Sequence, residues 1–417
     1  MVPVVKTICK DRFFMKLILS PILSSGFLVL FAYSGMVKWL PIFPIDPTFL
    51  SALGLLAILL CRVHKGFVKC RGNIFLTLLS VLLFFAWYFF SSIYTVSPEY
   101  FKHKALVLLL NIFAFIFPVI CFNTYQHFIQ FNRFLLALSL ITSLIILSIY
   151  IMFGSIDLIL YMSRMERETS KIPDYLALGS VIGLGILSLQ ARMSFAKGCF
   201  AILGVATMFV LGSRGPILFT GILFFLGLFL HKTEGSRLKK IPLYSLITVV
   251  AVSILLQWQG AERSFQRFAS IGSDTGARDG ALRVSEFVTA LKVISDSPLV
   301  GVGLGGYGIA GYQSDGNIYP HNIFLEAFAE TGFIGFLLFG LSMLSLLLLA
   351  PRICKTKDGV TYLILLLFVL LNYQKSGGFI SARNLYMFAG VYLSYLRLST
   401  ASPMQSEQKN NKVCYGS

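Results

Sequence analysis

Long, uninterrupted apolar runs recur along this chain of 417 residues, from Lys16 almost to Arg397. A bilayer core about 30 Å thick is crossed by a helix of roughly 20 apolar residues. Only 13% of the residues are charged and 56% are hydrophobic, whereas about 25% of the residues in a soluble domain are charged. The runs do not alternate between polar and apolar residues, as the strands of a closed barrel would. The sequence therefore predicts an all-α polytopic membrane protein.

The formal net charge of +17 would indicate nucleic-acid binding in a soluble protein. In a membrane protein, basic residues instead orient the helices and can bind phosphate, so no nucleic-acid partner is expected. The seven cysteines are scattered and predict neither a disulfide framework nor a metal site. Lys6, Lys10, Arg12 and Lys16 precede the first apolar run without a clear cleavage site, so that run is interpreted as a retained first helix.

The apolar runs predict about twelve transmembrane helices. If the N-terminus is cytoplasmic, the connections on that side hold most of the basic residues, as the positive-inside rule requires. Arg62, Lys65, Lys69 and Arg71 are one such group. The predicted spans lie near 17–35, 46–61, 73–93, 105–121, 134–153, 174–190, 196–211, 216–230, 242–257, 322–349, 360–373 and 379–396.

One connection, from about 258 to 321, is far longer than the others and lies outside in this topology. A loop of that length usually has a function or its own structure. Leu282, Phe287, Leu291 and Ile294 recur at near-helical spacing, which predicts an amphipathic helix on the membrane surface. The predicted organisation is spans 1 to 9 in 1–257, the outer loop with catalytic and substrate-binding elements in 258–321, spans 10 to 12 in 322–397, and a disordered cytoplasmic tail in 398–417.

His321 stands between Pro320 and Asn322 at the start of a long apolar helix. Proline suits the first turn of a helix, and the positive end of the helix disfavours an imidazolium. His321 is therefore predicted to be neutral and able to accept a proton as a general base. The alternative is an interfacial histidine that only caps its helix, and these residues alone leave both interpretations open.

Glu326 and Glu330 lie four residues apart and so share one face of the same helix. Acidic side chains in or near the membrane are costly and need partners. We favour pairing with a basic residue of another helix, and the alternative is a proton relay in a transporter. A nearby G-x-G-x-x-G match within 301–308 lacks a βαβ context, so it predicts a flexible loop that lets backbone approach a substrate and not a dinucleotide site.

Three arginines are candidate phosphate ligands on the outer side. Arg214 lies in a tight turn over 212–216 between two apolar spans, Arg283 starts the predicted amphipathic helix, and Arg383 opens the last span. A guanidinium binds phosphate oxygens bidentately and stays charged in a dry site, so converging arginines would fit a diphosphate leaving group. The alternative is that each anchors a helix end at the lipid headgroups. For Arg214 we favour phosphate binding over anchoring, because an arginine in a tight, glycine-flanked turn has little need to extend its side chain toward the headgroups.

These motifs and the overall layout resemble the O-antigen ligase and polymerase superfamily, the membrane glycosyltransferases that act on undecaprenyl-diphosphate-linked glycans. About twelve spans and one large periplasmic loop before the histidine helix extend the resemblance over most of the chain, and imply a GT-C-like fold whose loop contains short helices. The motifs that carry it are Gly212-Ser213-Arg214-Gly215, Asp296 to Gly303, and Pro320-His321-Asn322 followed by Leu325, Glu330 and Gly332.

By this resemblance, His321 matches the essential histidine of the family, Arg214 the arginine after its central spans, and Arg283 the arginine of its large loop. Arg383 and Asn322 join them as candidate diphosphate-binding residues. The implied reaction is attack of an acceptor sugar hydroxyl, deprotonated or oriented by the histidine, on the anomeric carbon of the donor. The reaction is implied to be inverting and independent of metal, with no cofactor.

The implied location is the bacterial inner membrane, with a periplasmic active site and both termini in the cytoplasm. The implied donor is an undecaprenyl-diphosphate-linked glycan, with membrane lipids and a chain-length regulator as further partners. A polymerase uses a lipid-linked repeat unit as acceptor, and a ligase uses the lipid A core. The run from Tyr319 to Gly335 is more similar to polymerases, so O-antigen polymerase is predicted, with ligase as the alternative. A polysaccharide transporter or flippase is more distant, because most arginines sit at span ends and the two halves differ.

Overall fold

The computed structural model describes residues 19–36, 46–64, 72–153, 175–190, 194–230 and 274–401. All regular secondary structure in these ranges is helical. The helices are α3 (Pro21–Ala32), α4 (Pro47–His64), α5 (Asn73–Phe90), α6 (Tyr100–Cys121), α7 (Tyr125–Phe153), α9 (Tyr175–Ser188), α10 (Phe195–Val210), α11 (Arg214–Leu230), α15 (Asp274–Asp296), α16 (Tyr307–Tyr312), α17 (Ile323–Leu347), α18 (Ala350–Ile353), α19 (Lys357–Lys375) and α20 (Arg383–Ala401), with short 3-10 helices η1 (Ser34–Met36) and η2 (Ser91–Ile93).

Among the described helices, 5 candidate spans are long and apolar enough to cross a membrane. They are Pro47–His64, Asn73–Ile93, Tyr100–Cys121, Tyr125–Phe153 and Ile323–Ile353. The structure thus confirms an all-helical membrane protein over the described residues. Helices α3, α9, α10 and α11 are shorter apolar helices at four other predicted spans, and α19 and α20 occupy the last two. The predicted span 242–257 lies outside the described residues, so a total of about twelve stays a prediction.

The outward faces of the candidate spans are apolar. On α4, the exposed side chains Phe49, Leu53, Leu56 and Leu60 form one stripe at intervals of three and four residues. In water, extended apolar surface of this kind would promote association. In a membrane, lipid chains cover such a surface at no cost in free energy, because they are as apolar as leucine. The stripe therefore indicates a lipid-facing side of the helix.

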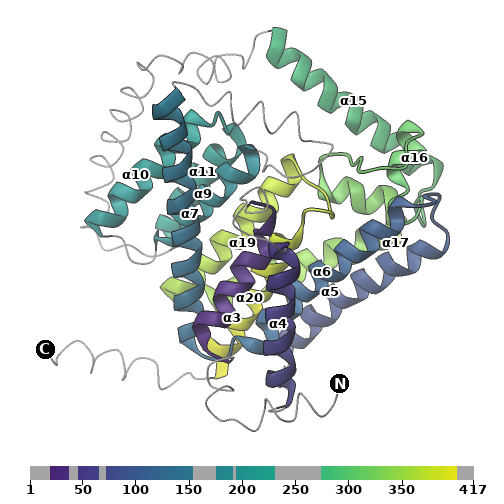
Figure 1. The fold of residues 1–417 in the computed structure, drawn as a ribbon. Coiled ribbons are helices and arrows are strands. Elements are labelled where there is room, and N and C mark those ends of the chain that lie inside the picture. The colour runs from purple at the N-terminus through teal and green to yellow at the C-terminus, as the bar shows by residue number, and fades with distance from the viewer. Residues whose placement is uncertain are drawn as a thin grey trace, which may run out of the picture.

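The helices form two groups around a shared centre (Figure 1). Helices α3, α4, α19 and α20 lie in the middle, with α7, α9, α10 and α11 on one side and α5, α6 and α17 on the other. Helix α20 packs along α6, α5 along α17, and α11 along both α9 and α19. Helix α15 runs from beside α16 along the upper edge of the view. Helix α19 thus packs against helices that come from distant parts of the sequence, including α9, α11 and α17.

Helix α17 is kinked at Gly332, which has φ of 65° and ψ of −169°. This left-handed conformation favours glycine and interrupts the backbone ladder of the helix. The chain segment 298–303 fills the interruption. Four hydrogen bonds join the two segments: Phe333 N to Pro298 O (2.8 Å), Ile334 N to Leu299 O (3.4 Å), Val302 N to Ala329 O (3.0 Å) and Gly303 N to Glu330 O (2.8 Å).

The glycine-rich segment is a packed part of the protein. Gly301, Gly303 and Gly305 all have positive φ and are buried. A side chain at Gly301 would overlap the backbone of Glu330, and one at Gly303 would overlap the backbone of Thr95. The prediction of a flexible loop that lets backbone approach a substrate is therefore wrong for these residues. The missing side chains instead let the segment lie against α17 and the residues before α6.

Helix α15 confirms a helix in the long loop, but it begins at Asp274. Arg283 therefore lies within the helix and does not start it, because the helix extends further toward the N-terminus than the apolar spacing indicated. The predicted apolar face is divided: Ile294 is buried, whereas Phe287 and Leu291 are exposed. Tertiary packing decides this division, because α15 packs against α16 and α17 and buries Ile294 while Phe287 and Leu291 stay exposed.

Candidate active site

His321 directly precedes the cap of α17. The helix begins at Ile323, and its N-cap is Asn322, whose Oδ1 accepts hydrogen bonds from the backbone N–H groups of Phe324 (2.9 Å) and Leu325 (3.1 Å). Asparagine is a preferred N-cap because it accepts from these otherwise unpaired donors. Pro320 consequently precedes the helix, and its expected place in the first turn is wrong. His321 lies at the junction between the long loop and the helix.

The backbone of His321 has φ of 51°. In the described part of the chain, His321 and Gln313 are the non-glycine residues with positive φ, a conformation that is uncommon outside glycine. Such local strain persists where surrounding contacts hold it, and it is concentrated at functional sites. The ring of Tyr319 lies against the imidazole, with 4.7 Å between ring centroids. These contacts orient an imidazole whose side chain remains 40% exposed.

A carboxylate from α15 lies beside the imidazole. His321 Nε2 is 3.5 Å from Glu286 Oε1, which is within the reach expected of catalytic groups before a substrate tightens them. A carboxylate in this position can orient an imidazole and stabilise the positive charge that develops when the ring accepts a proton. Sequence reasoning missed Glu286, although its place one helical turn after Arg283 on a predicted helix was a usable signal.

A small apolar cluster holds Glu286 in place. Ala290 and Val293, on the turns of α15 that follow Glu286, are buried against Tyr307 of α16 and Ala329 of α17. The Tyr307 hydroxyl also donates a hydrogen bond to the backbone carbonyl of Glu286, at 3.4 Å. Because burial of alanine, valine and tyrosine side chains fixes the rotation of α15, the carboxylate is directed toward His321.

Asn322 also ties α17 to the end of α19. Its Nδ2 donates to the backbone carbonyl of Gln374 (3.0 Å) and to Gln374 Oε1 (3.1 Å). Both polar atoms of the Asn322 side chain are thus bonded to protein. The predicted role of Asn322 in substrate binding stays a prediction, and its contacts make it a positioning residue for His321.

Arg214 is the first residue of α11, so the turn predicted over 212–216 ends before it and residues 214–216 belong to the helix. Gly212 has φ of 63°, and Ser213 is buried. Lys375, the last residue of α19, packs over Gly215: a Cβ placed there would be 2.9 Å from Lys375 Nζ and 3.1 Å from its Cδ. The structure therefore brings the Arg214 turn to the same end of α19 that contacts Asn322.

Three cations lie close enough together to influence one another. Burial lowers the pKa of Lys375, and the positive charges of Arg283 and Arg214 lower it further. The charges of Arg214 and Arg283, two of the three predicted arginines, thus act on a lysine that sequence reasoning did not include. Its signal was its place in the outer turn between the last two predicted spans. The third arginine, Arg383, has different surroundings.

Arg383 opens α20 and anchors that helix. Its Nη1 donates to the carbonyl of Phe31 (2.7 Å) and to Ser34 Oγ (3.0 Å), and its guanidinium carbon lies 4.8 Å from the centre of the Phe31 ring. These contacts join α20 to the end of α3 and to η1. They correspond to an anchoring role, and diphosphate binding by Arg383 stays a prediction.

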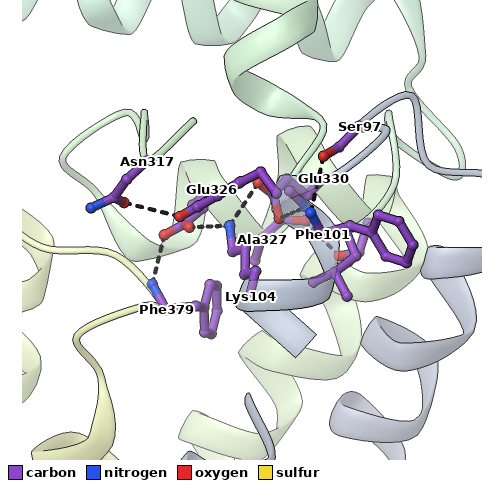
Figure 2. Close-up of polar contacts among 12 residues, drawn as sticks. Ser97, Phe101, Lys104, Asn317, Glu326, Ala327, Glu330 and Phe379 are labelled. Carbon is purple, nitrogen blue, oxygen red and sulfur yellow. Dashed lines mark hydrogen bonds and ion pairs between the residues drawn. The ribbon is translucent and has the colours of Figure 1, made fainter. Parts of the chain in front are cut away.

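The two glutamates of α17 are paired with a lysine of another helix, as we favoured. Lys104 Nζ of α6 lies 2.6 Å from Glu326 Oε1 and 2.7 Å from Glu330 Oε1 (Figure 2). All three side chains are buried. A buried ion pair is tolerated when its remaining oxygens are also hydrogen-bonded. Here Glu326 Oε2 accepts from the backbone N–H of Phe379 (2.8 Å).

The second carboxylate is equally well bonded. Glu330 Oε2 accepts from the Tyr88 hydroxyl (2.6 Å) and from the backbone N–H of Gly305 (3.0 Å). The Lys104 cluster, which we define as Lys104, Glu326 and Glu330, thereby connects α5, α6, α17, the glycine-rich segment and the turn before α20. It lies within the first turns of α6 and α17, directly after the Asn322 cap. Its position indicates a support for the histidine segment and not a midspan proton relay.

The fold and these contacts define a class: a polytopic helical membrane protein with a histidine beside a carboxylate and with a group of cations. Residues 199–340 match the family described as O-antigen ligase. The match supports the predicted resemblance to the O-antigen ligase and polymerase superfamily. It contains Arg214, Arg283, Glu286 and His321 and ends before Lys375. A comparison with curated proteins gave no match.

Proposed function

We propose that this protein is a membrane glycosyltransferase that transfers glycan from undecaprenyl diphosphate to a sugar hydroxyl, most specifically an O-antigen polymerase. One observation carries the proposal: a histidine with an adjacent carboxylate and a separate group of cations occur within and beside a segment that matches the O-antigen ligase family. Glycan transfer from a lipid diphosphate requires a proton acceptor for the incoming hydroxyl and positive charge for the departing diphosphate.

In the proposed reaction, His321 Nε2 accepts the proton of the acceptor hydroxyl as that oxygen forms a bond to the anomeric carbon. The bond between the anomeric carbon and the diphosphate oxygen breaks, and its electron pair leaves with undecaprenyl diphosphate. Glu286 stabilises the imidazolium that forms. Attack from the face opposite the leaving group inverts the anomeric centre, and no metal is required for any of these steps.

Arg214 and Arg283 bind the diphosphate in this proposal. Guanidinium groups bind phosphate oxygens bidentately and keep their charge where water is scarce. Their attraction increases as negative charge develops on the leaving group, which stabilises the transition state more than the bound donor. Asn322 acts as a positioning residue, because both polar atoms of its side chain are bonded to the protein. Arg383 anchors α20 through the hydrogen bonds of its Nη1 to Phe31 and Ser34.

The topology follows from the same chemistry. The loop of 258–321 supplies Arg283 and Glu286, and we place it on the periplasmic face, where lipid-linked glycans are assembled into surface polysaccharide. Spans 1 to 9 within 1–257 and spans 10 to 12 within 322–397 would then enclose the lipid-facing part of the site. Both termini, including the tail of 398–417, would be cytoplasmic.

Polymerase and ligase share this chemistry and differ in the acceptor. We favour polymerase because the run from Tyr319 to Gly335 is more similar to the polymerase pattern. A polymerase transfers the growing chain to a lipid-linked repeat unit, with a chain-length regulator as a further partner. A ligase transfers it to the lipid A core. The acceptor is the feature that an experiment must identify.

The test is the lipopolysaccharide gel pattern of a deletion strain complemented with wild type, His321→Ala, Arg214→Ala or Lys292→Ala at matched membrane expression. Lys292 is the control because it is an exposed basic residue of α15. Core bearing a single repeat unit in the deletion strain supports a polymerase, and bare core with long glycan retained on the carrier lipid indicates a ligase. If His321→Ala and Arg214→Ala both restore the full ladder, the proposed catalytic roles are wrong and a transporter becomes the better explanation.

A further inference from the structure

The last two residues of α19 connect the two segments that carry His321 and Arg214. Gln374 accepts both hydrogen bonds from Asn322 Nδ2, at 3.0 and 3.1 Å. Lys375 lies over Gly215, beside Arg214, with its Nζ 2.9 Å from where a Cβ of residue 215 would be. Consecutive residues of one helix thus contact the histidine segment and the arginine turn. Their contacts fix the position of Lys375 relative to both.

The environment of Lys375 collects positive charge. Its side chain is half-buried, and the charges of Arg283 and Arg214 act on it unfavourably. Within the described residues, Lys375 has no carboxylate at ion-pair distance. Two acidic side chains of the site have partners other than Lys375: Glu286 lies beside His321, and Glu326 is bound by Lys104. An anion that binds among the three cations would remove their mutual repulsion.

We propose that Lys375 binds the diphosphate of the lipid-linked donor, together with Arg214 and Arg283. This inference rests on the proposed function and adds a residue to its site. The three cations come from α11, α15 and α19, so the anion would be bound from three sides. An ammonium group is a compact point charge with three donors, and it complements the planar guanidinium groups.

The geometry also explains why a glycine follows Arg214. A side chain at position 215 would occupy the space of the Lys375 amine and of its Cδ. The glycine therefore lets the ammonium group come close to the Arg214 turn. In the proposed reaction, Lys375 stabilises the negative charge that remains on the diphosphate oxygen when its bond to the anomeric carbon breaks.

The test uses the full-length protein in lipid nanodiscs with an undecaprenyl-diphosphate-linked glycan as donor. Lys375→Met removes the charge at similar length, Lys375→Arg keeps it, and Lys292→Met removes an exposed charge of α15 as the control. We expect Lys375→Met to raise the donor KM or lower kcat by about tenfold or more, the loss typical of a hydrogen bond to a charged group. Lys375→Arg should recover part of this loss, and Lys292→Met should match wild type.

A second readout does not depend on glycan transfer. Inorganic pyrophosphate should protect wild type from thermal unfolding and should protect Lys375→Met much less at the same concentration. Lys375→Gln replaces Lys375→Met if the latter is not recovered folded. Wild-type transfer with unchanged kinetics and unchanged pyrophosphate protection in the charge-removing variant would overturn the role of Lys375 while the proposed function stands. Pyrophosphate protection that requires Lys375, in a wild type that transfers no glycan, would support the anion site and contradict the proposed function.

Discussion

His321 Nε2 lies 3.5 Å from Glu286 Oε1, although His321 precedes α17 and Glu286 lies on α15. The two side chains meet because Ala290 and Val293 pack α15 against α17. His321 is held by a backbone with positive φ. Glu286 is held by α15, whose residues Ala290 and Val293 are buried.

Replacing Glu286 with glutamine should lower kcat and leave the donor KM nearly unchanged. Glutamine keeps the size of the side chain but cannot stabilise the positive charge that develops on His321. We expect a loss of about tenfold to a hundredfold, at the low end of general acid–base contributions. Steady-state kinetics of the purified protein measure it.

Lys292→Gln serves as the control for Glu286→Gln, because Lys292 is exposed on the same helix. Equal rates for wild type and Glu286→Gln would show that the carboxylate does not assist His321. A rise in donor KM without a change in kcat would instead assign Glu286 to donor binding.

Replacing Lys104 with methionine should destabilise the protein severely. The change leaves Glu326 and Glu330 buried without their cation, and breaking a buried ion pair costs about 3–5 kcal/mol. Thermal unfolding in detergent, followed by size-exclusion chromatography, measures the loss. Additional Glu326→Gln and Glu330→Gln substitutions should recover part of the stability, because they remove the uncompensated charges.

Lys102→Met offers a matched comparison for Lys104. Lys102 pairs with Glu99 at 2.8 Å, but the two side chains are 60% and 75% exposed. An exposed pair contributes about 0–1 kcal/mol, so this variant should unfold close to wild type. Similar losses for the two lysines would contradict a special role for the Lys104 cluster.

Gly332→Ala should prevent correct folding, whereas Gly340→Ala in the same helix should be tolerated. A Cβ at Gly332 would collide with the backbone of Leu299, and φ of 65° is unfavourable for alanine. Position 340 has nothing within 4 Å of a Cβ, and alanine there favours the helix by about 1 kcal/mol. The yields of folded protein from membranes compare the two. A normal yield of Gly332→Ala would mean that the kink at Gly332 is not required.

The hydrogen bonds of the Asp315 carboxylate to the start of α6 should make the stability of the protein depend on pH in the acid range. Its carboxylate accepts from Ser97 Oγ (2.6 Å) and from the backbone N–H groups of Glu99 (2.9 Å) and Tyr100 (3.1 Å), at the start of α6. Desolvation acts to raise the pKa of Asp315, but these hydrogen bonds outweigh it, so the pKa is lowered. The stabilisation is complete above about pH 4, the ordinary aspartate value, and is lost as pH falls through the lower pKa of the folded state.

Asp315→Asn tests this dependence, because asparagine can accept some of the same hydrogen bonds without the charge. Wild type should be more stable than the variant near neutral pH, and the difference should shrink as pH is lowered through the titration of Asp315. Unfolding curves at several pH values measure it. A difference that stays constant over this range would show that the charge does not contribute.

The candidate site was only partly readable from the sequence. His321 stood out because it lies at the start of a long apolar helix, and Arg214 because it lies in a glycine-flanked turn between two apolar runs. Glu286 and Lys375 did not, since a charged residue on a loop helix or at a helix end is common. Arg383 also opens an apolar helix, as Arg214 does, yet its guanidinium donates hydrogen bonds to Phe31 and Ser34. Local pattern cannot separate these cases, because the separating contacts come from distant segments.

The sequence by itself determined the helical membrane class, the helix of the long loop, the turn at Arg214 and the need of Glu326 and Glu330 for a basic partner. Each follows from local hydropathy, helical spacing or the cost of burying charge. Only the tertiary structure decided that the partner is Lys104, that Glu286 faces His321, and that Lys375 lies beside Arg214. Those pairings depend on how helices far apart in the chain pack and rotate against one another, and no local stretch of sequence contains that information.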